Sequence, residues 1–273
     1  MTAPHTAAQP TALTPDTGDH LGHFVYHDLM TTDPAGARAF YAALLGWECT
    51  PRDVGGFEYT DVRAAGQRFG GMVPLDPAHG LPSHWTSYVA VDDVDAACAR
   101  ATAAGGRVCV PTHAIPGGVG HFAVLNDPTS AMFSVVRFTD GRTPVADNVR
   151  GGAWWHELLS QDPERAAAFY AAVFGWEAAS LPMPDGQTYW MLTAGGRNVG
   201  GLMRAPADMG DMSAWQLYIA LENLGEVDAA VARATALGGG VTWPAMDVPD
   251  IGRMAGLADP AGAHFAVGAP ATD

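Results

Sequence analysis

The sequence contains no lysine, and all 14 of its basic residues are arginine. Schiff-base catalysis and a phosphate-binding P-loop are therefore excluded, because each requires a lysine amine. Acidic residues number 29, which gives a formal net charge of -15. Such a surface repels phosphate backbones and anionic lipid headgroups, so the sequence predicts no nucleic-acid partner and no membrane partner.

Cysteine is also scarce. Cys49, Cys98 and Cys109 form no CxxC pair and leave an odd count, which argues against a disulfide framework or a zinc site and favours a reducing cytoplasm. We expect Cys98 in a helix and Cys109 in a strand, both buried. Residues 1–20 have neither the basic start nor the apolar stretch of a signal peptide, so they are expected to form a flexible arm. No apolar run is long enough to span a membrane.

The most informative feature that is present is an internal repeat. The segment HDLMTTDPAGARAFYAALLGWE, from His27, returns from His156 as HELLSQDPERAAAFYAAVFGWE, with 13 of 22 positions identical. Shorter matches follow in the same order: Gly70-Gly71 with Gly200-Gly201, Trp85–Tyr88 with Trp215–Tyr218, Ala99–Thr102 with Ala232–Thr235, and Asp127-Pro128 with Asp259-Pro260. The chain is therefore predicted to hold two homologous units, residues 21–138 and 152–268, joined by a linker at 139–151.

Each unit is predicted to contain the pattern βαβββ twice. In unit 1, a strand over Phe24–Met30 precedes Asp33 and Pro34, an N-cap followed by proline at the first helical position. Apolar residues from Ala37 onward recur at helical spacing, and Gly46 ends the helix. Further expected elements are a helix from Val94 and strands at Phe57–Val62, Gly71–Leu75, Ser87–Val91, near Val108, His121–Leu125 and Ala131–Val136. The predicted fold class is α+β, with curved, mainly antiparallel sheets backed by helices.

Several motifs resemble a known superfamily. The FY-x-x-x-hydrophobic-GW motif, the AVDDVDAA helix start and the late DP turn, set in four βαβββ modules, resemble vicinal oxygen chelate proteins. That superfamily includes glyoxalase I, extradiol dioxygenases, and bleomycin- and fosfomycin-resistance proteins. Within it, the chain looks most like the tandem glyoxalase-like proteins of actinobacteria. The resemblance implies curved sheets that enclose small-molecule clefts.

Enzymes of this superfamily usually hold a divalent metal through four ligands on the concave sheet. The resemblance places these positions at Tyr26, Thr86, Ser134 and near Met72 in unit 1, and at Trp155, Gln216, Ala266 and near Leu202 or Met203 in unit 2. Metal sites need three or four converging His, Cys or carboxylate ligands, and only Gln216 is suited to coordination here. We therefore expect no metal and no cofactor.

Two histidines bear on that expectation. His27 and His156 lie one residue past the ligand position of each first strand. In a regular strand they face the helices, where a hydrogen-bonded structural role is expected. A β-bulge would turn them into the cleft and restore a ligand role.

Alternation along the strands predicts which side chains line the clefts. Asp28 and Glu157 occupy equivalent positions, and a carboxylate on an apolar wall has a raised pKa, which suits general acid or base catalysis. The alternative is that each pairs with an arginine such as Arg63 or Arg107, or reaches solvent. The candidate catalytic residues are Asp28, Glu157 and His264, and the candidate substrate-binding residues are Tyr26, Trp155, Thr86, Gln216, Met132 and Ser134. Unit 2 carries the richer set and is the predicted working site.

Aromatic and thioether side chains beside a few polar groups suit a flat organic ligand. Three functions stay open. The first is a metal-independent tailoring enzyme or accessory for an aromatic or polyketide-like metabolite of secondary metabolism. The second is a non-catalytic protein that binds a drug or metabolite, as resistance proteins do. The third is a metal-dependent glyoxalase or dioxygenase. A monomer built as an internal pseudo-dimer, or a homodimer, is expected.

Overall fold

The computed structural model describes residues 20–139, 149–183 and 185–271. The predicted N-terminal arm and most of the predicted linker lie outside these residues. The first sheet runs in the order β2 (Glu48–Asp53), β3 (Glu58–Ala64), β4 (Gln67–Pro74), β1 (Phe24–Thr31), β5 (His84–Ala90), β8 (Met132–Phe138), β7 (Gly120–Asn126) and β6 (Arg107–Ile115). The second runs β10 (Glu177–Pro182), β11 (Thr188–Ala194), β12 (Arg197–Arg204), β9 (Ala153–Ser160), β13 (Ala214–Ala220), β16 (His264–Pro270), β15 (Gly252–Ala258) and β14 (Gly240–Val248).

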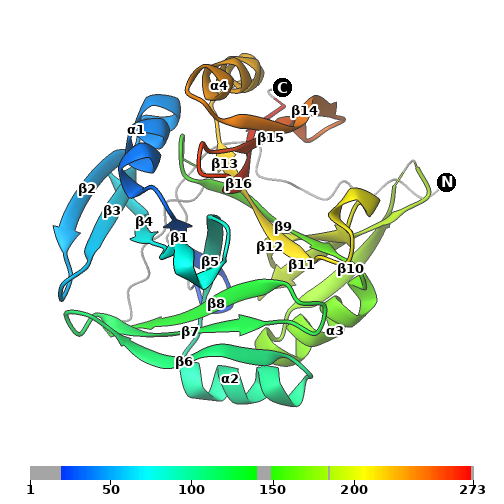
Figure 1. The fold of residues 1–273 in the computed structure, drawn as a ribbon. Coiled ribbons are helices and arrows are strands. Elements are labelled where there is room, and N and C mark those ends of the chain that lie inside the picture. The colour runs from blue at the N-terminus through cyan, green and yellow to red at the C-terminus, as the bar shows by residue number, and fades with distance from the viewer. Residues whose placement is uncertain (1–19, 140–148, 184, 272–273) are drawn as a thin grey trace.

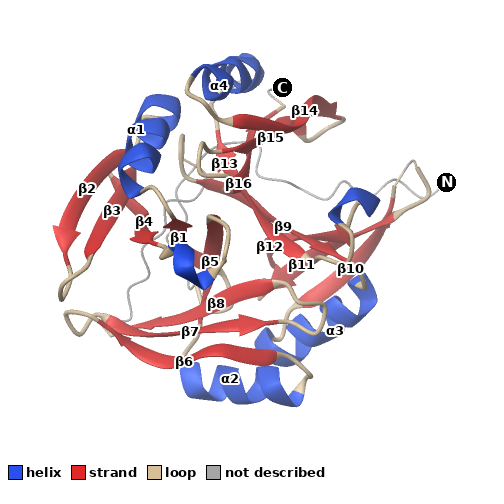
Figure 2. Ribbon diagram, viewed as in Figure 1, coloured by secondary structure: helices blue, strands red, loops and turns tan. Residues whose placement is uncertain are grey.

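The described residues also form four α-helices. They are α1 (Pro34–Leu45), α2 (Val94–Ala103), α3 (Pro163–Phe174) and α4 (Leu224–Ala236), with short 3₁₀ helices at Pro77–His79 and Ala207–Met209. Each sheet is mixed: β1 runs parallel to β4 and β5 parallel to β8, while the other neighbours in that sheet are antiparallel. Each sheet bends along its width, as Figure 2 shows. The α+β fold of four βαβββ modules, predicted from the repeat, is confirmed.

Helix α1 begins and ends where local chemistry predicts. The Asp33 side chain accepts a hydrogen bond from the Gly36 amide at 2.9 Å, and Pro34 occupies the first turn. Gly46 ends the helix with a φ of 75°, a conformation that glycine adopts without strain. The predicted apolar face is the buried one, formed by Ala37, Phe40, Tyr41, Leu44 and Leu45.

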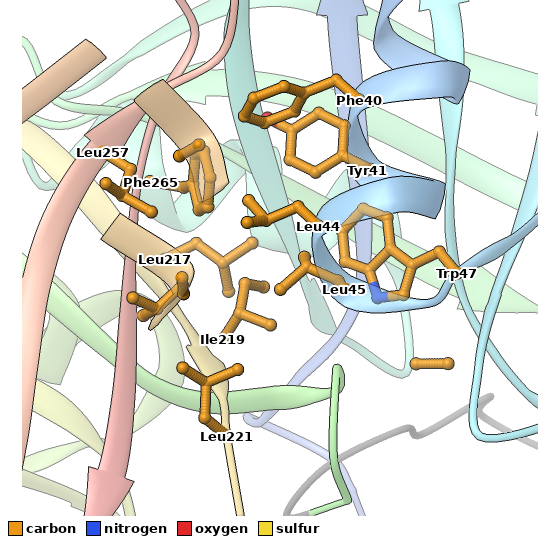
Figure 3. Close-up of a cluster of buried hydrophobic side chains, with 14 of the residues drawn as sticks. Phe40, Tyr41, Leu44, Leu45, Trp47, Leu217, Ile219, Leu221, Leu257 and Phe265 are labelled. Carbon is orange, nitrogen blue, oxygen red and sulfur yellow. The ribbon is translucent and has the colours of Figure 1, made fainter. Parts of the chain in front are cut away.

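Both large apolar cores cross from one unit to the other. In one core, α1 and strands β3 and β4 of unit 1 pack against α4 and strands β13, β15 and β16 of unit 2. Figure 3 shows Phe40, Tyr41 and Leu44 of α1 facing Leu217, Leu257 and Phe265. In the other core, α2 packs with α3 near the bottom of Figure 1. The helix sides of the two sheets therefore face each other, and neither unit completes a core alone.

The repeated motifs form reciprocal bonds across this interface. The Tyr41 hydroxyl of unit 1 donates to Asp259 Oδ2 of unit 2 at 3.2 Å, and Tyr170 of unit 2 donates to Asp127 Oδ2 of unit 1 at 3.2 Å. Each tyrosine also accepts from a tryptophan Nε1, Trp85 at 3.0 Å and Trp215 at 2.8 Å. The FY, Trp and DP motifs are thus parts of one hydrogen-bonded joint that occurs twice.

Some local predictions need correction. Cys109 lies on β6 as predicted, but it is exposed rather than buried, whereas Cys98 in α2 is half-buried. Strand β2 was not located from the sequence because nearly all of its residues are exposed and it lacks apolar alternation.

No helix among the described residues is long and apolar enough to cross a membrane.

Candidate functional site

Each sheet has one face turned toward the helices and an opposite face, which we call the open face. On β1, Tyr26 and Asp28 belong to the open face, where both contact Tyr88, while Leu29 and His27 point to the core on the helix side. The register of β1 against β5 shifts between Phe24 and Tyr26, which marks a bulge. Because this bulge precedes Tyr26, it does not turn His27 toward the open face.

The two histidines lie at the joint between the units. The Nδ1 atom of His27 is 3.0 Å from the Ser87 hydroxyl, and its ring lies 5.1 Å from that of His156. The His156 ring also stacks on Phe24, with a centroid distance of 4.1 Å. Burial lowers the pKa of His27 to about 3 and that of His156 well below its usual value. Both rings are therefore neutral at pH 7 and serve the interface.

Asp28 is the centre of the open face of unit 1. Its Oδ1 accepts a hydrogen bond from Tyr59 at 2.9 Å, and its Oδ2 accepts one from Tyr88 at 2.9 Å. The hydroxyl of Tyr26 lies 2.8 Å from that of Tyr59. Arg52, which lies over the Tyr59 ring, pairs with Asp61 and not with Asp28. The groups that stabilise the carboxylate are neutral: the two tyrosine hydroxyls and, to a smaller extent, the Gly71 amide.

Desolvation dominates the acidity of Asp28. Its side chain is only 7% exposed, and burial raises the pKa to about 6, although the hydroxyls of Tyr59 and Tyr88 act to lower it. Burial likewise raises the pKa of Tyr26, with the nearby Asp28 charge adding to the effect, so the phenol is neutral at pH 7. A carboxyl group with such a pKa exchanges a proton near neutral pH, as a general acid or base must.

Unit 2 repeats this arrangement with two changes, Glu157 in place of Asp28 and Trp155 in place of Tyr26. Glu157 Oε2 accepts a hydrogen bond from Tyr218 at 2.7 Å, and the Tyr189 hydroxyl also acts to lower the pKa of this carboxyl. The position of Tyr26 is taken by Trp155, whose Nε1 donates to the Tyr189 hydroxyl at 3.0 Å. Burial raises the pKa of Glu157, as it does for Asp28. Glu157 is half-buried, whereas Asp28 is buried.

A glycine makes room for each tyrosine. A Cβ atom added at Gly71 would overlap the hydroxyl of Tyr59, and one added at Gly201 would overlap the hydroxyl of Tyr189. Gly71 is paired with Asp28 on the adjacent strand β4, and Gly201 with Glu157 on β12. The second glycine of each Gly-Gly motif therefore lets a tyrosine from the next strand cross to the carboxylate.

The other candidate residues surround these clusters at different depths. The Thr86 hydroxyl lies 3.1 Å from that of Ser134, and both are buried, so they bond each other beneath the surface. Met132 precedes Ser134 by two residues and shares its face. Gln216 pairs with Glu157 across β13 and β9, and is half-buried.

His264 and the predicted arginine partners lie farther out. His264 is exposed at the first residue of β16, two strands from Glu157, or about 10 Å at ordinary strand spacing. Arg63 is exposed and donates to the Gly66 carbonyl, and Arg107 is exposed at the start of β6. The alternative that these arginines pair with the carboxylates is wrong, because tyrosines fill that role.

Comparison with known proteins agrees with this architecture. A model of the glyoxalase-like domain matches residues 24–136 and 145–268. The chain belongs to this family. It is 37% identical over 248 residues to CFP32 of Mycobacterium tuberculosis, named as a candidate glyoxylase, across 89% of this chain and 93% of the relative. It is 32% identical over 256 residues to the anthracycline biosynthesis protein DnrV of Streptomyces peucetius, across 89% and 91%.

Solved structures show the same glyoxalase-like fold. The Mn(II)-bound glyoxalase from Novosphingobium aromaticivorans aligns with a TM-score of 0.65 at 17% identity, covering 92% of this chain and 82% of that one. The 2,3-dioxygenase LapB from Pseudomonas sp. KL28 aligns with a TM-score of 0.62 at 13% identity, covering 92% and 93%. At these identities the likeness establishes the fold alone. The predicted vicinal oxygen chelate membership, with two tandem units, is confirmed.

The residues of this glyoxalase-like chain do not fit the divalent metal that its fold family implies. Among the residues that the structure describes, no three His, Cys, Asp or Glu side chains gather as a metal ion requires. Each open-face cluster contains one carboxylate, and its neighbours are phenols or an indole. Met72 and Leu202, which the resemblance placed near a ligand position, lie in the apolar cores on the helix side.

Four tyrosines of these clusters were missed from the sequence. Tyr88 and Tyr218 occur in the matched Trp-x-x-Tyr segments, and Tyr59 and Tyr189 are separated by the same 130 positions as the glycines beside them. Recurrence at equivalent positions was therefore the available signal. It did not show that a phenol from β3 or β11 crosses a glycine to reach the carboxylate, because that contact depends on strand pairing.

Proposed function

We propose that this glyoxalase-like protein is a metal-independent tailoring enzyme, or an accessory to one, for a small aromatic or polyketide-like metabolite. The observation that carries the proposal is the pair of desolvated carboxylates, Asp28 and Glu157: two tyrosine hydroxyls donate to Asp28, and Tyr218 donates to Glu157. A carboxyl group with a raised pKa takes a proton from a carbon or oxygen beside a carbonyl and returns it elsewhere. Similarity to a protein named for anthracycline biosynthesis supports an aromatic, polyketide-like ligand.

The remaining residues of the open faces have binding roles in this proposal. In unit 2, Trp155, Trp243 and Met254 pack around Tyr218 and supply a flat, polarisable surface. Stacking on such rings contributes about 0.5–1.5 kcal/mol beyond simple burial. Tyr26 provides the matching surface in unit 1, and Gln216, Thr86, Met132 and Ser134 contact polar and apolar edges of the ligand. His264, at the rim, is a candidate second acid or base.

Two substitutions test the chemistry. Glu157→Gln and Asp28→Asn keep the side-chain volume and remove the ionisable group. A thermal-shift screen of planar aromatic ketones, phenols and quinones first identifies a ligand, and turnover is then measured. We expect at least one variant to lose turnover by roughly 10²-fold or more while it still binds the ligand. Full turnover in both variants would end the acid–base proposal.

Binding without catalysis is the second candidate function. It is favoured by the aromatic surface around Trp155 and Trp243, which needs no reactive group to hold a planar molecule. In that case both carboxylate variants retain affinity, and no compound that binds is converted. Metal analysis of protein purified without an affinity tag tests the metal-dependent alternative. Stoichiometric metal whose removal abolishes turnover would overturn the metal-independent proposal.

A further inference from the structure

The two carboxylate clusters differ at the position of Tyr26 and Trp155, and this difference bears on how a proton moves. In unit 1, the hydrogen-bond chain that leads from the carboxylate ends at the Tyr26 hydroxyl, 2.8 Å from the Tyr59 hydroxyl, where either atom can be the donor. In unit 2, the Trp155 indole takes this place, and its Nε1 is 3.0 Å from the Tyr189 hydroxyl. A hydroxyl both donates and accepts a hydrogen bond, whereas an indole nitrogen only donates.

This difference makes the chain of hydrogen bonds in unit 1 reversible. When Asp28 is ionised, Tyr59 donates to it and accepts from Tyr26. When Asp28 carries a proton, that proton is donated to Tyr59, Tyr59 donates to Tyr26, and Tyr26 donates outward. In unit 2, Tyr189 cannot pass its proton to Trp155, because the indole nitrogen only donates.

We propose that Tyr26 is a catalytic residue of unit 1, whose hydroxyl passes protons between a bound ligand and Asp28 through Tyr59. The inference rests on the proposed acid–base function of Asp28. It assigns proton relay to unit 1 and leaves unit 2 with direct contact to half-buried Glu157 or with binding alone. This differs from the preference for unit 2 that residue composition suggests.

The proton balance of the step is simple. As a C–H bond beside a carbonyl breaks, the ligand keeps the electron pair as an enolate and its proton goes to the Tyr26 oxygen. The proton of Tyr26 moves to Tyr59, and that of Tyr59 moves to the Asp28 carboxylate, which becomes a neutral acid. Reversal returns a proton to the ligand. Each phenol remains neutral before and after the step.

Depth supports an indirect path in unit 1. Asp28 is 7% exposed, while Tyr26 and Tyr59 are only partly buried. Tyr88 covers the second oxygen of the carboxylate. Gly71, which lacks a side chain, lets the Tyr59 hydroxyl pass between the strands to Asp28. A ligand on the open face therefore meets Tyr26 before it meets the carboxylate.

The test uses 2-tetralone, a bicyclic aromatic ketone with acidic hydrogens beside its carbonyl, as the probe. Exchange of these hydrogens for deuterium in D₂O is followed by NMR with the full chain. The wild type is expected to accelerate exchange over buffer, and Asp28→Asn to remove most of the acceleration; a wild type that does not accelerate exchange overturns the proposal. Tyr26→Phe, which keeps the ring, should lower the maximal rate by about 10²-fold with little change in KM. Trp155→Phe is the matched change in unit 2. The fold decrease that it causes in the maximal rate should be at least tenfold smaller than the decrease caused by Tyr26→Phe.

A gain-of-function variant tests the inference without altering Tyr26. In the Asp28→Asn background, Trp155→Tyr supplies the missing hydroxyl to unit 2 and should restore exchange to at least tenfold above that background. Absence of this gain, or a wild-type rate in Tyr26→Phe, overturns the relay. If Tyr26→Phe retains exchange that Asp28→Asn loses, the relay fails and the proposed acid–base function stands. If Asp28→Asn exchanges as fast as the wild type, that function of Asp28 fails as well.

Discussion

At the scale of single residues, Asp28 and Glu157 are unusual in being stabilised by phenols and not by cations. A cation beside a buried carboxylate favours the charged form strongly and lowers its pKa. Two neutral hydroxyls favour it less, so desolvation prevails and the pKa of each carboxyl is raised. The tyrosines thus hold the carboxylates in place while leaving them able to accept a proton near neutral pH.

The raised pKa of Asp28 predicts a pH-dependent stability. The pKa is 3.8 for the ordinary side chain and about 6 in the protein. Between these pH values the folded state therefore keeps a proton on Asp28 that the unfolded state has lost. Stability from this group is therefore lost as pH rises through that range. Relative to Asp28→Asn, the wild type should lose on the order of 1–3 kcal/mol of unfolding free energy between pH 4 and 7. Urea unfolding of both proteins at a series of pH values measures this difference. If the unfolding free energies of the wild type and Asp28→Asn change in parallel with pH, the prediction is contradicted.

Gly71 predicts a steric effect on the same carboxylate. In Gly71→Ala the new methyl group displaces the Tyr59 hydroxyl, so Asp28 loses one donor and its pKa rises above about 6. Carbon-13 NMR titration of the aspartate carboxyl groups measures this shift. Gly240→Ala, at the start of β14, is the control, because its Cβ would meet only Ala258 at an ordinary 3.9 Å. An unchanged Asp28 titration in Gly71→Ala would show that Tyr59 does not act on the carboxylate.

At the scale of secondary structure, the helices carry the joint between the units. The N-terminal cap and apolar face of α1 were predictable, since both depend on neighbours within the helix. What the face packs against was not, because α1 contacts α4 and strands of the other unit. The exposed edge strand β2 has no apolar pattern in the sequence, so only its pairing with β3 in the structure shows where it lies.

The tyrosines of α1 and α3 predict coupled stability changes. Tyr41→Phe leaves the half-buried Trp85 indole without its acceptor and removes the donor to Asp259. We expect a loss of about 1–3 kcal/mol in the free energy of unfolding. Because Asp259 is the partner of this hydroxyl, Tyr41→Phe and Asp259→Asn should be non-additive by about 0.5–3 kcal/mol in a double-mutant cycle. Simple additivity would show that the bond contributes nothing across the interface.

At the scale of the whole molecule, the two units form one structure because their helix sides cover each other. His27 and His156 lie at the centre of this arrangement, stacked on one another and flanked by Phe69 and Phe24. A charge on either ring would be buried beside the other ring, which is why desolvation lowers the pKa of both. The interface therefore depends on two neutral histidines.

This arrangement predicts destabilisation by acid. The unfolded chain binds a proton at each histidine near pH 6.5, while folded His27 does so only near pH 3, so stability is lost as pH falls through this range. At pH 5, His27 should cost about 2 kcal/mol of unfolding free energy relative to neutral pH, and the lowered pKa of His156 acts in the same direction. In His156→Phe, the loss of unfolding free energy between neutral pH and pH 5 should therefore be smaller than in the wild type. His121→Ala, at an exposed position on β7, is the control and should lose as much unfolding free energy as the wild type. A loss in His156→Phe equal to that of the wild type would contradict the prediction.

Much of this protein was determined by the sequence itself. The repeat, the helix caps and the strand alternation are short-range or self-comparing signals, so the fold and the open-face positions of Asp28 and Glu157 followed from them. The tertiary structure alone decided the partners of these groups. Strand pairing brings Tyr59 over Gly71 to Asp28, and packing of the units brings Tyr41 to Asp259, 218 residues away. Such contacts depend on the register between distant segments, which no local pattern encodes.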